Sequence, residues 1–135
     1  MKTPALLSVA LLLLLVSVVP TTSSDQTPIT IQVTNAVTNS PNKTYSTYVA
    51  FRGILIGGLR RLQESSPCFT FTYSEHPDYG PFLESVNGLA GNFSERTYWE
   101  LLVKKTNNHT IRPDVGIGCY IPNANEQIIL KYTTY

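Results

Sequence analysis

Residues 79–102 read YGPFLESVNGLAGNFSERTYWELL and contain the single tryptophan of the chain, Trp99. Two apolar segments, at residues 82–86 and 97–103, flank a loop that is rich in Gly and Asn. Short apolar runs separated by such a loop predict two strands joined by a turn. We expect this hairpin to present an apolar, aromatic face to a ligand.

The second segment of the hairpin carries apolar residues on both of its faces. Alternate residues of a strand point to the same side of a sheet, and core packing explains one apolar side. An uncovered second side would be available to a ligand or a protein partner, because ligand sites are largely apolar. The alternative is that Trp99 is a core residue. The two faces are Trp99, Leu101 and Val103 on one side, and Tyr98, Glu100 and Leu102 on the other.

Outward from the hairpin, the chain predicts further strands around one helix. Alternating or β-favouring residues predict strands at residues 29–34, 44–51, 69–74, 115–121 and 127–132. The N-terminal pair reads as a hairpin, and the later strands are short and mostly antiparallel. This order of elements favours an α+β fold of the β-grasp type over a doubly wound parallel sheet.

The helix is predicted at residues 54–64, where the apolar period changes. Leu55, Leu59 and Leu62 recur at i, i+4 and i+7, which is the pattern of a short amphipathic helix. Two glycines at residues 57–58 weaken the helix by about 1 kcal/mol each relative to alanine. Packing on a sheet must therefore hold the helix, or the glycines allow it to approach the sheet closely.

The first 24 residues have the composition of a secretory signal peptide. Lys2 precedes an apolar run at residues 5–19, and Pro20 and four small hydroxyl residues follow it. The run is short for a membrane span, which needs roughly 20 apolar residues, although an uncleaved anchor is the alternative. Cleavage near Ser24 would leave one secreted, extracellular domain at residues 25–135, with no later segment able to cross a bilayer.

The charge balance argues against nucleic acid as a partner. Removing Lys2 from the ten basic residues leaves nine, against nine acidic residues. Phosphate binding needs an excess of Lys and Arg, which this chain does not have.

No motif points to catalysis. The sequence has no G-x-S-x-G elbow, P-loop or G-x-G-x-x-G. His76 with Asp78 is one pair, whereas zinc needs three or four ligands. Glu84, Glu95 and Glu100 are carboxylates of the kind that serve acid–base catalysis, but nothing in the sequence sets their distances. We therefore expect no catalytic residue, no metal and no enzymatic activity.

Two cysteines and three glycosylation sequons fit a secreted protein. An even pair of cysteines in such a chain usually forms a disulfide, which predicts a Cys68–Cys119 bridge. The sequons begin at Asn42, Asn92 and Asn108. A glycan is bulky, so these three positions should lie on exposed turns or edges.

Five pieces of the chain carry a resemblance through their order and spacing. They are FTFTY at 69–73, YGPFLESVNG at 79–88, YWELL at 98–102, GIGCYIP at 116–122 and EQIIL at 126–130. Together they resemble the C-terminal domain of the cobalamin carriers transcobalamin, intrinsic factor and haptocorrin. The resemblance covers nearly the whole of the expected mature chain, from Ile29 to Tyr135.

The resemblance implies a β-grasp-like domain that caps a corrinoid held against a large helical domain. We expect that helical domain to be absent from this chain. Cobalamin would be a ligand here rather than a cofactor. The ligand contacts that the resemblance implies are Tyr79, Gly80, Pro81, Phe82, Leu83, Trp99, Glu100, Leu101 and Leu102.

Two functions follow as alternatives. The first is a secreted cobalamin-binding or transport-related protein that acts alone, as a homodimer or with a separate helical chain. The second is a secreted glycoprotein that reuses the domain as an interaction module without binding cobalamin. Half a pocket should bind weakly, because a single open face buries less of a large ligand.

Overall fold

The computed structural model describes residues 26–78 and 80–135, so the predicted leader at residues 1–24 lies outside the described residues. In the described part of the chain, no helix is both long and apolar enough to cross a membrane. The elements are β1 (Gln26–Asn35), β2 (Lys43–Ala50), α2 (Leu55–Ser65), β3 (Phe71–His76), β4 (Gly80–Val86), β5 (Leu89–Ala90), β6 (Thr97–Lys104), β7 (Thr110–Ile111) and β8 (Gln127–Thr134).

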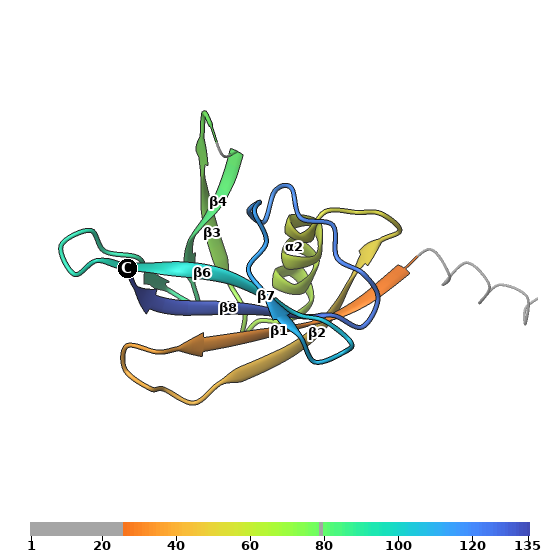
Figure 1. Cartoon of the computed structure of the whole chain (residues 1–135), viewed down its shortest axis with the longest axis horizontal. Coiled ribbons are helices and arrows are strands. Elements are labelled where there is room, and N and C mark those ends of the chain that lie inside the picture. The colour runs from red at the N-terminus through yellow and green to blue at the C-terminus, as the bar shows by residue number, and fades with distance from the viewer. Residues whose placement is uncertain (1–25, 79) are drawn as a thin grey trace, which may run out of the picture.

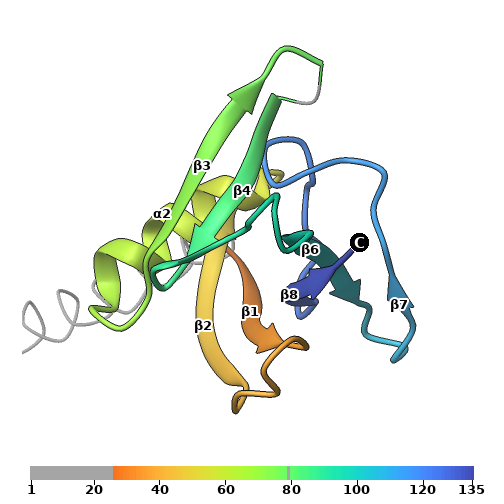
Figure 2. The same ribbon diagram turned by 90° about the vertical axis from the view of Figure 1, so that its left-hand side faces the viewer.

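The main sheet contains five strands in the order β2-β1-β8-β6-β7 (Figure 1). Strands β1 and β2 form the predicted N-terminal hairpin, β8 runs parallel to β1, and β6 runs antiparallel to β8. Strands β3, β4 and β5 form a second sheet, whose β3–β4 hairpin projects away from the first (Figure 2). The predicted α+β, β-grasp-like fold is confirmed. The hairpin predicted between residues 82–86 and 97–103 is wrong, because β4 and β6 belong to different sheets and pair with other strands.

One face of the main sheet carries the core. A row of apolar side chains crosses the three central strands, because Ile31 on β1 pairs with Ile128 on β8, which pairs with Val103 on β6, and all three are fully buried. Helix α2 packs against β2, and the predicted stripe of Leu55, Leu59 and Leu62 is buried. The second sheet adds Phe71 and Val86 to the same core. The opposite face carries the half-buried pair Leu102 and Ile129.

Gly58 lets α2 approach the main sheet closely. A Cβ atom at this position would lie 2.9 Å from Cγ1 of Val49 and 3.4 Å from Cδ1 of Ile29. Both neighbours belong to buried core residues, so an alanine here would force the helix and the sheet apart. The expectation that a glycine serves close helix–sheet packing is confirmed for Gly58, whereas a Cβ at Gly57 would meet nothing within 4 Å.

The strand predicted at residues 115–121 is wrong, because this segment forms a turn in the loop between β7 and β8. The carbonyl of Gly116 accepts hydrogen bonds from the N–H groups of Cys119 and Tyr120, at 3.1 and 3.0 Å. Two carbonyls of the loop also serve the start of α2, which has no side-chain cap. Tyr120 accepts from the N–H of Leu55 at 2.8 Å, and Ile117 accepts from that of Ile56 at 2.9 Å.

The predicted Cys68–Cys119 disulfide is also wrong, because both cysteines are free and exposed. Cys119 lies in the loop that contacts the start of α2, whereas Cys68 follows the end of the helix by three residues. A helix of 11 residues is about 16 Å long. The Cα atoms of a disulfide lie within about 7 Å of each other, so α2 holds these two cysteines too far apart.

Candidate functional site

A cavity of about 680 Å³ opens beside β6. Its walls are β4, the loop at residues 91–96 with the first half of β6, and the loop at residues 112–117, with Tyr135 at its margin. The tip of the β3–β4 hairpin meets the loop between β7 and β8 at Pro81, because a Cβ at Gly118 would lie 2.7 Å from Cδ of Pro81. Gly118 therefore allows this loop to approach Pro81 closely.

The structure brings five of the predicted ligand contacts together around the cavity. They are Phe82, Leu83, Trp99, Glu100 and Leu101. Their part in ligand binding stays a prediction.

The other four predicted contacts are placed differently. Pro81 contacts the loop at Gly118 and is not one of the lining residues. Gly80 lies at the start of β4 with a positive φ of 69°, a conformation that favours glycine. Leu102 follows the lining residues on β6 and is half-buried. Tyr79 lies outside the described residues.

Trp99 is a core residue, so the expectation that it forms an open aromatic face is not met. It is 7% exposed, and its indole N–H donates to the carbonyl oxygen of Leu89 at 2.8 Å. Its ring lies 5.1 Å from that of Tyr132, measured between centroids. The exposed apolar surface of the cavity comes instead mainly from Phe93, at 92%, with Tyr135, Phe82 and Val115 also exposed. A concave opening does lie beside the indole, with Trp99 as part of its floor.

The outer edge of β6 is covered only at its two ends in the described chain. Strand β7 pairs with Val103 and Lys104 alone. At the other end, Asn92 forms an isolated bridge with Thr97, in which the N–H of each residue donates to the carbonyl of the other, at 3.1 and 3.0 Å. The edge between these two contacts borders the cavity.

The main chain of Trp99 and Leu101 points toward this uncovered edge. Lys105 uses the same edge, because its N–H donates to the carbonyl of His109 at 2.8 Å. In antiparallel strands, alternate residues direct their N–H and C=O groups to the same side. Thr97 and Lys105 therefore fix the same direction for Trp99, Leu101 and Val103, and of these three only Val103 is paired with β7. The cavity thus offers two N–H donors and two C=O acceptors along one line.

An ion pair adds charge to the cavity wall. Glu100 is only 6% exposed, and its carboxylate pairs with the guanidinium of Arg112, whose side chain is 69% exposed. The hydroxyl of Tyr98 donates to Oε2 of Glu100 at 3.3 Å. Burial raises the pKa of Tyr98 above 10.0 and the charge of Glu100 raises it further, whereas Arg112 acts in the opposite direction. This group gives the apolar cavity a polar anchor.

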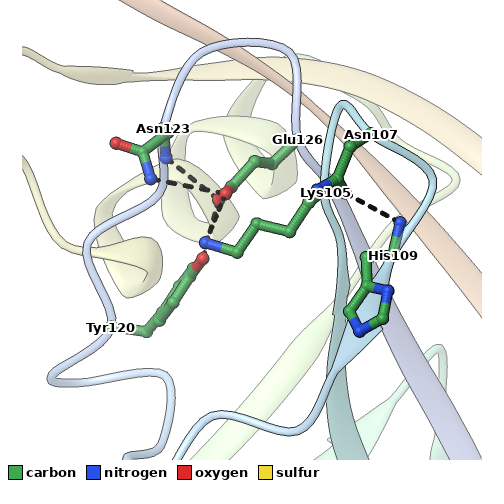
Figure 3. A network of polar contacts seen from close by, with 6 residues as sticks. All are labelled: Lys105, Asn107, His109, Tyr120, Asn123 and Glu126. Carbon is green, nitrogen blue, oxygen red and sulfur yellow. Dashed lines mark hydrogen bonds and ion pairs between the residues drawn. The ribbon is translucent and has the colours of Figure 1, made fainter.

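A second buried glutamate fixes the loop that forms one wall (Figure 3). Glu126 is 2% exposed and accepts hydrogen bonds from the hydroxyl of Tyr120 at 2.7 Å and the N–H of Asn123 at 3.0 Å. The ammonium of Lys105 lies 3.0 Å from its carboxylate. The network ties the loop before β8 to the end of β6.

The network shifts two pKa values. Burial by itself raises the pKa of Glu126, but the hydrogen bonds from Tyr120, Asn123 and Lys105 outweigh burial and hold it below 4.5. Burial and the bond to Glu126 raise the pKa of Tyr120. Sequence reasoning missed both ion pairs, because their members come from separate segments, and no spacing signals that they meet.

Nothing in the described residues suggests a metal centre. Between residues 26–78 and 80–135, no three His, Cys, Asp or Glu side chains come together as a metal site requires. The three predicted glycosylation positions are all exposed, as expected for sequons. Asn42 and Asn108 lie in loops or turns, and Asn92 forms the isolated bridge described above.

The sequence comparisons identify relatives among curated proteins. No protein-family profile matches the chain. Cobalamin binding intrinsic factor of Mus musculus is 31% identical over 94 residues, which is 70% of this chain and 21% of that protein. The protein of the same name from Homo sapiens is 29% identical over 94 residues, and human transcobalamin-1 is 28% identical over 97 residues. The chain spans about a fifth of the length of these relatives.

The structure comparisons agree on the fold. Haptocorrin, solved in complex with Cbi, matches with a TM-score of 0.69 and 21% identity over 82% of this chain and 25% of that chain. A putative metal binding protein from Ruminococcus gnavus matches with a TM-score of 0.55 and 13% identity, over 81% of this chain and 98% of its own. At these identities the likeness concerns the fold alone.

Proposed function

We propose that this chain, a homologue of the C-terminal part of the cobalamin carriers, is a secreted protein that binds a corrinoid in the cavity beside β6. One observation carries the proposal. The cavity gathers residues from both segments that the resemblance to the carriers implies as ligand contacts, Phe82 and Leu83 on β4 and residues 99–101 on β6.

The chemistry of the cavity suits a corrinoid. The macrocycle is broad and apolar, and Phe82 and Leu83 supply apolar surface at the cavity wall. The amide groups around a corrinoid both donate and accept hydrogen bonds, as do the open main-chain groups of Trp99 and Leu101. Pairing these groups matters, because a buried polar group without a partner costs about 1–3 kcal/mol.

The cavity would enclose only part of such a ligand. Its volume of about 680 Å³ is that of a drug-sized site, and a corrinoid is larger. The remaining surface of the ligand would face solvent, a second copy of the chain or a separate helical chain. We therefore expect weak binding by the isolated protein, because affinity depends on enclosure and preorganisation.

The test is a titration of the purified protein with cobalamin, followed by the absorbance of the ligand and the emission of Trp99. Trp99 is the single tryptophan of the chain and forms part of the cavity floor, so its emission reports on this site. The variant Phe82→Ala removes exposed apolar surface from the cavity and should weaken the response several-fold. Phe51→Ala is the matched control, because Phe51 is 66% exposed and lies outside the lining. A flat titration at millimolar cobalamin would reject the proposal.

The open edge of β6 supports a second candidate function. An extended segment of a protein partner can add to an unpaired strand edge through main-chain hydrogen bonds. In this case the chain would be a secreted interaction module that does not bind cobalamin. Hydrogen exchange and the cobalamin titration together separate the two functions. An interaction module should show a flat cobalamin titration, and a bound strand of its partner should slow the exchange of the amides of both Trp99 and Leu101.

A further inference from the structure

The sequon Asn92-Phe93-Ser94 lies at the mouth of the cavity. Asn92 and Phe93 both belong to its lining, and both are exposed. The other two sequons are exposed as well, but Asn42 lies in the loop between β1 and β2, and Asn108 lies in the turn between β6 and β7. Neither residue lines the cavity.

The main chain holds Asn92 firmly in this position. Its N–H and C=O both bond to Thr97, at 3.1 and 3.0 Å, and its N–H also donates to Oγ1 of Thr97 at 2.9 Å. Its side-chain Oδ1 accepts from the N–H of Ser94 at 2.8 Å. This turn engages the amide oxygen, whereas a glycan is attached through the amide nitrogen. A group attached here would therefore start from a fixed point beside the opening.

We propose that Asn92 carries an N-linked glycan that lies across the mouth of the cavity and restricts ligand entry. The inference rests on the secretion that the proposed function includes, because sequons are glycosylated only in that route. A glycan is bulky and hydrophilic, and its attachment point is pinned to the first residue of β6. It would also cover part of Phe93, a large apolar side chain that is 92% exposed.

The test compares two secreted forms of the whole chain from mammalian cells. The variant Ser94→Ala destroys the sequon but keeps Asn92 and the N–H that its Oδ1 contacts. Peptide mass spectrometry should find a glycan on Asn92 in the wild type and none in the variant. Hydroxyl-radical footprinting should then label Phe82 several-fold more slowly in the glycosylated protein. Phe51 is the internal control, because it is exposed outside the cavity and should be labelled equally in both forms.

The variants Asn42→Gln and Asn108→Gln test whether the effect belongs to one glycan. Both should leave the labelling of Phe82 unchanged.

Cobalamin titration should show several-fold tighter binding to Ser94→Ala than to the glycosylated wild type. An unmodified Asn92, or equal labelling of Phe82 with and without its glycan, overturns the inference. A lack of cobalamin binding in every form counts against the proposed function, and footprinting still decides this inference.

Discussion

Glu100 and Glu126 are both buried carboxylates with a cationic partner, yet they differ in what surrounds the pair. Glu126 is 2% exposed, and its partner Lys105 is 33% exposed within a network that includes Tyr120. Glu100 is 6% exposed, but its partner Arg112 is 69% exposed on the cavity wall.

The difference separates a structural charge from one that a ligand can reach. The partners of Glu126 hold a loop in place, and their contacts with Glu126 leave them unable to bind a ligand in the cavity. Arg112 has five N–H donors, and its open position leaves it able to contact a molecule in the cavity while it neutralises Glu100. We therefore expect substitutions at the first pair to change stability and those at the second to change binding.

The largest effect is expected for Glu126→Ala. Removal of the carboxylate leaves Lys105 and the hydroxyl of Tyr120 without their buried acceptor, and breaking such a pair costs about 3 kcal/mol. Urea unfolding followed by circular dichroism would measure the loss. Glu95→Ala is the matched control, since Glu95 is exposed and should cost less than about 0.5 kcal/mol. Equal stability of the two variants would contradict a structural role for Glu126.

Acid should produce a smaller effect at the same residue. The pKa of Glu126 is held below 4.5 in the folded protein, so the folded state takes up a proton less readily than the unfolded chain. Its contribution to stability is complete above the unfolded pKa and is lost as the pH falls through the folded value. The free energy of unfolding should therefore fall more steeply below pH 4.5 in the wild type than in Glu126→Gln. Parallel pH profiles would show that the network does not stabilise the charged form.

The smallest change in stability is expected for Arg112→Met. The variant leaves the buried carboxylate of Glu100 without its cation, but the hydroxyl of Tyr98 still donates to Glu100, and Arg112 is 69% exposed, so the loss of stability should stay below that of Glu126→Ala. Binding of cobalamin should nevertheless weaken several-fold, as measured by the same titration. Arg52→Met is the control, because Arg52 is exposed and outside the cavity. A loss of stability as large as that of Glu126→Ala would show that the pair of Glu100 and Arg112 stabilises the fold as the pair of Glu126 and Lys105 does.

Local patterns in the sequence predicted most of the fold. The leucine stripe of α2 and the alternation in the strands each reflect burial of one side of an element. The spacing of the apolar residues along the sequence indicates which side is buried. The segment at residues 115–121 shows the limit of this reasoning. Its apolar alternation imitates a strand, but its carbonyls are needed at the start of α2.

The candidate site was predictable only in part. The resemblance to the carriers pointed to Phe82, Leu83 and residues 99–101, which line one cavity. Neither Arg112 nor Phe93 was predicted, because each reaches the cavity from a loop whose path depends on contacts between distant segments. The burial of Trp99 was left open for the same reason, since the strand β5 that accepts its indole N–H comes from the second sheet.

The two cysteines at opposite ends of α2 have a practical consequence. Because they cannot close a ring within one molecule, air oxidation would join molecules to one another through either end of the helix. Non-reducing electrophoresis of an aged sample would then show a ladder of covalent oligomers. Serine at both positions would leave a single species, and an apparent partner seen only without reductant would be an artefact of this chemistry.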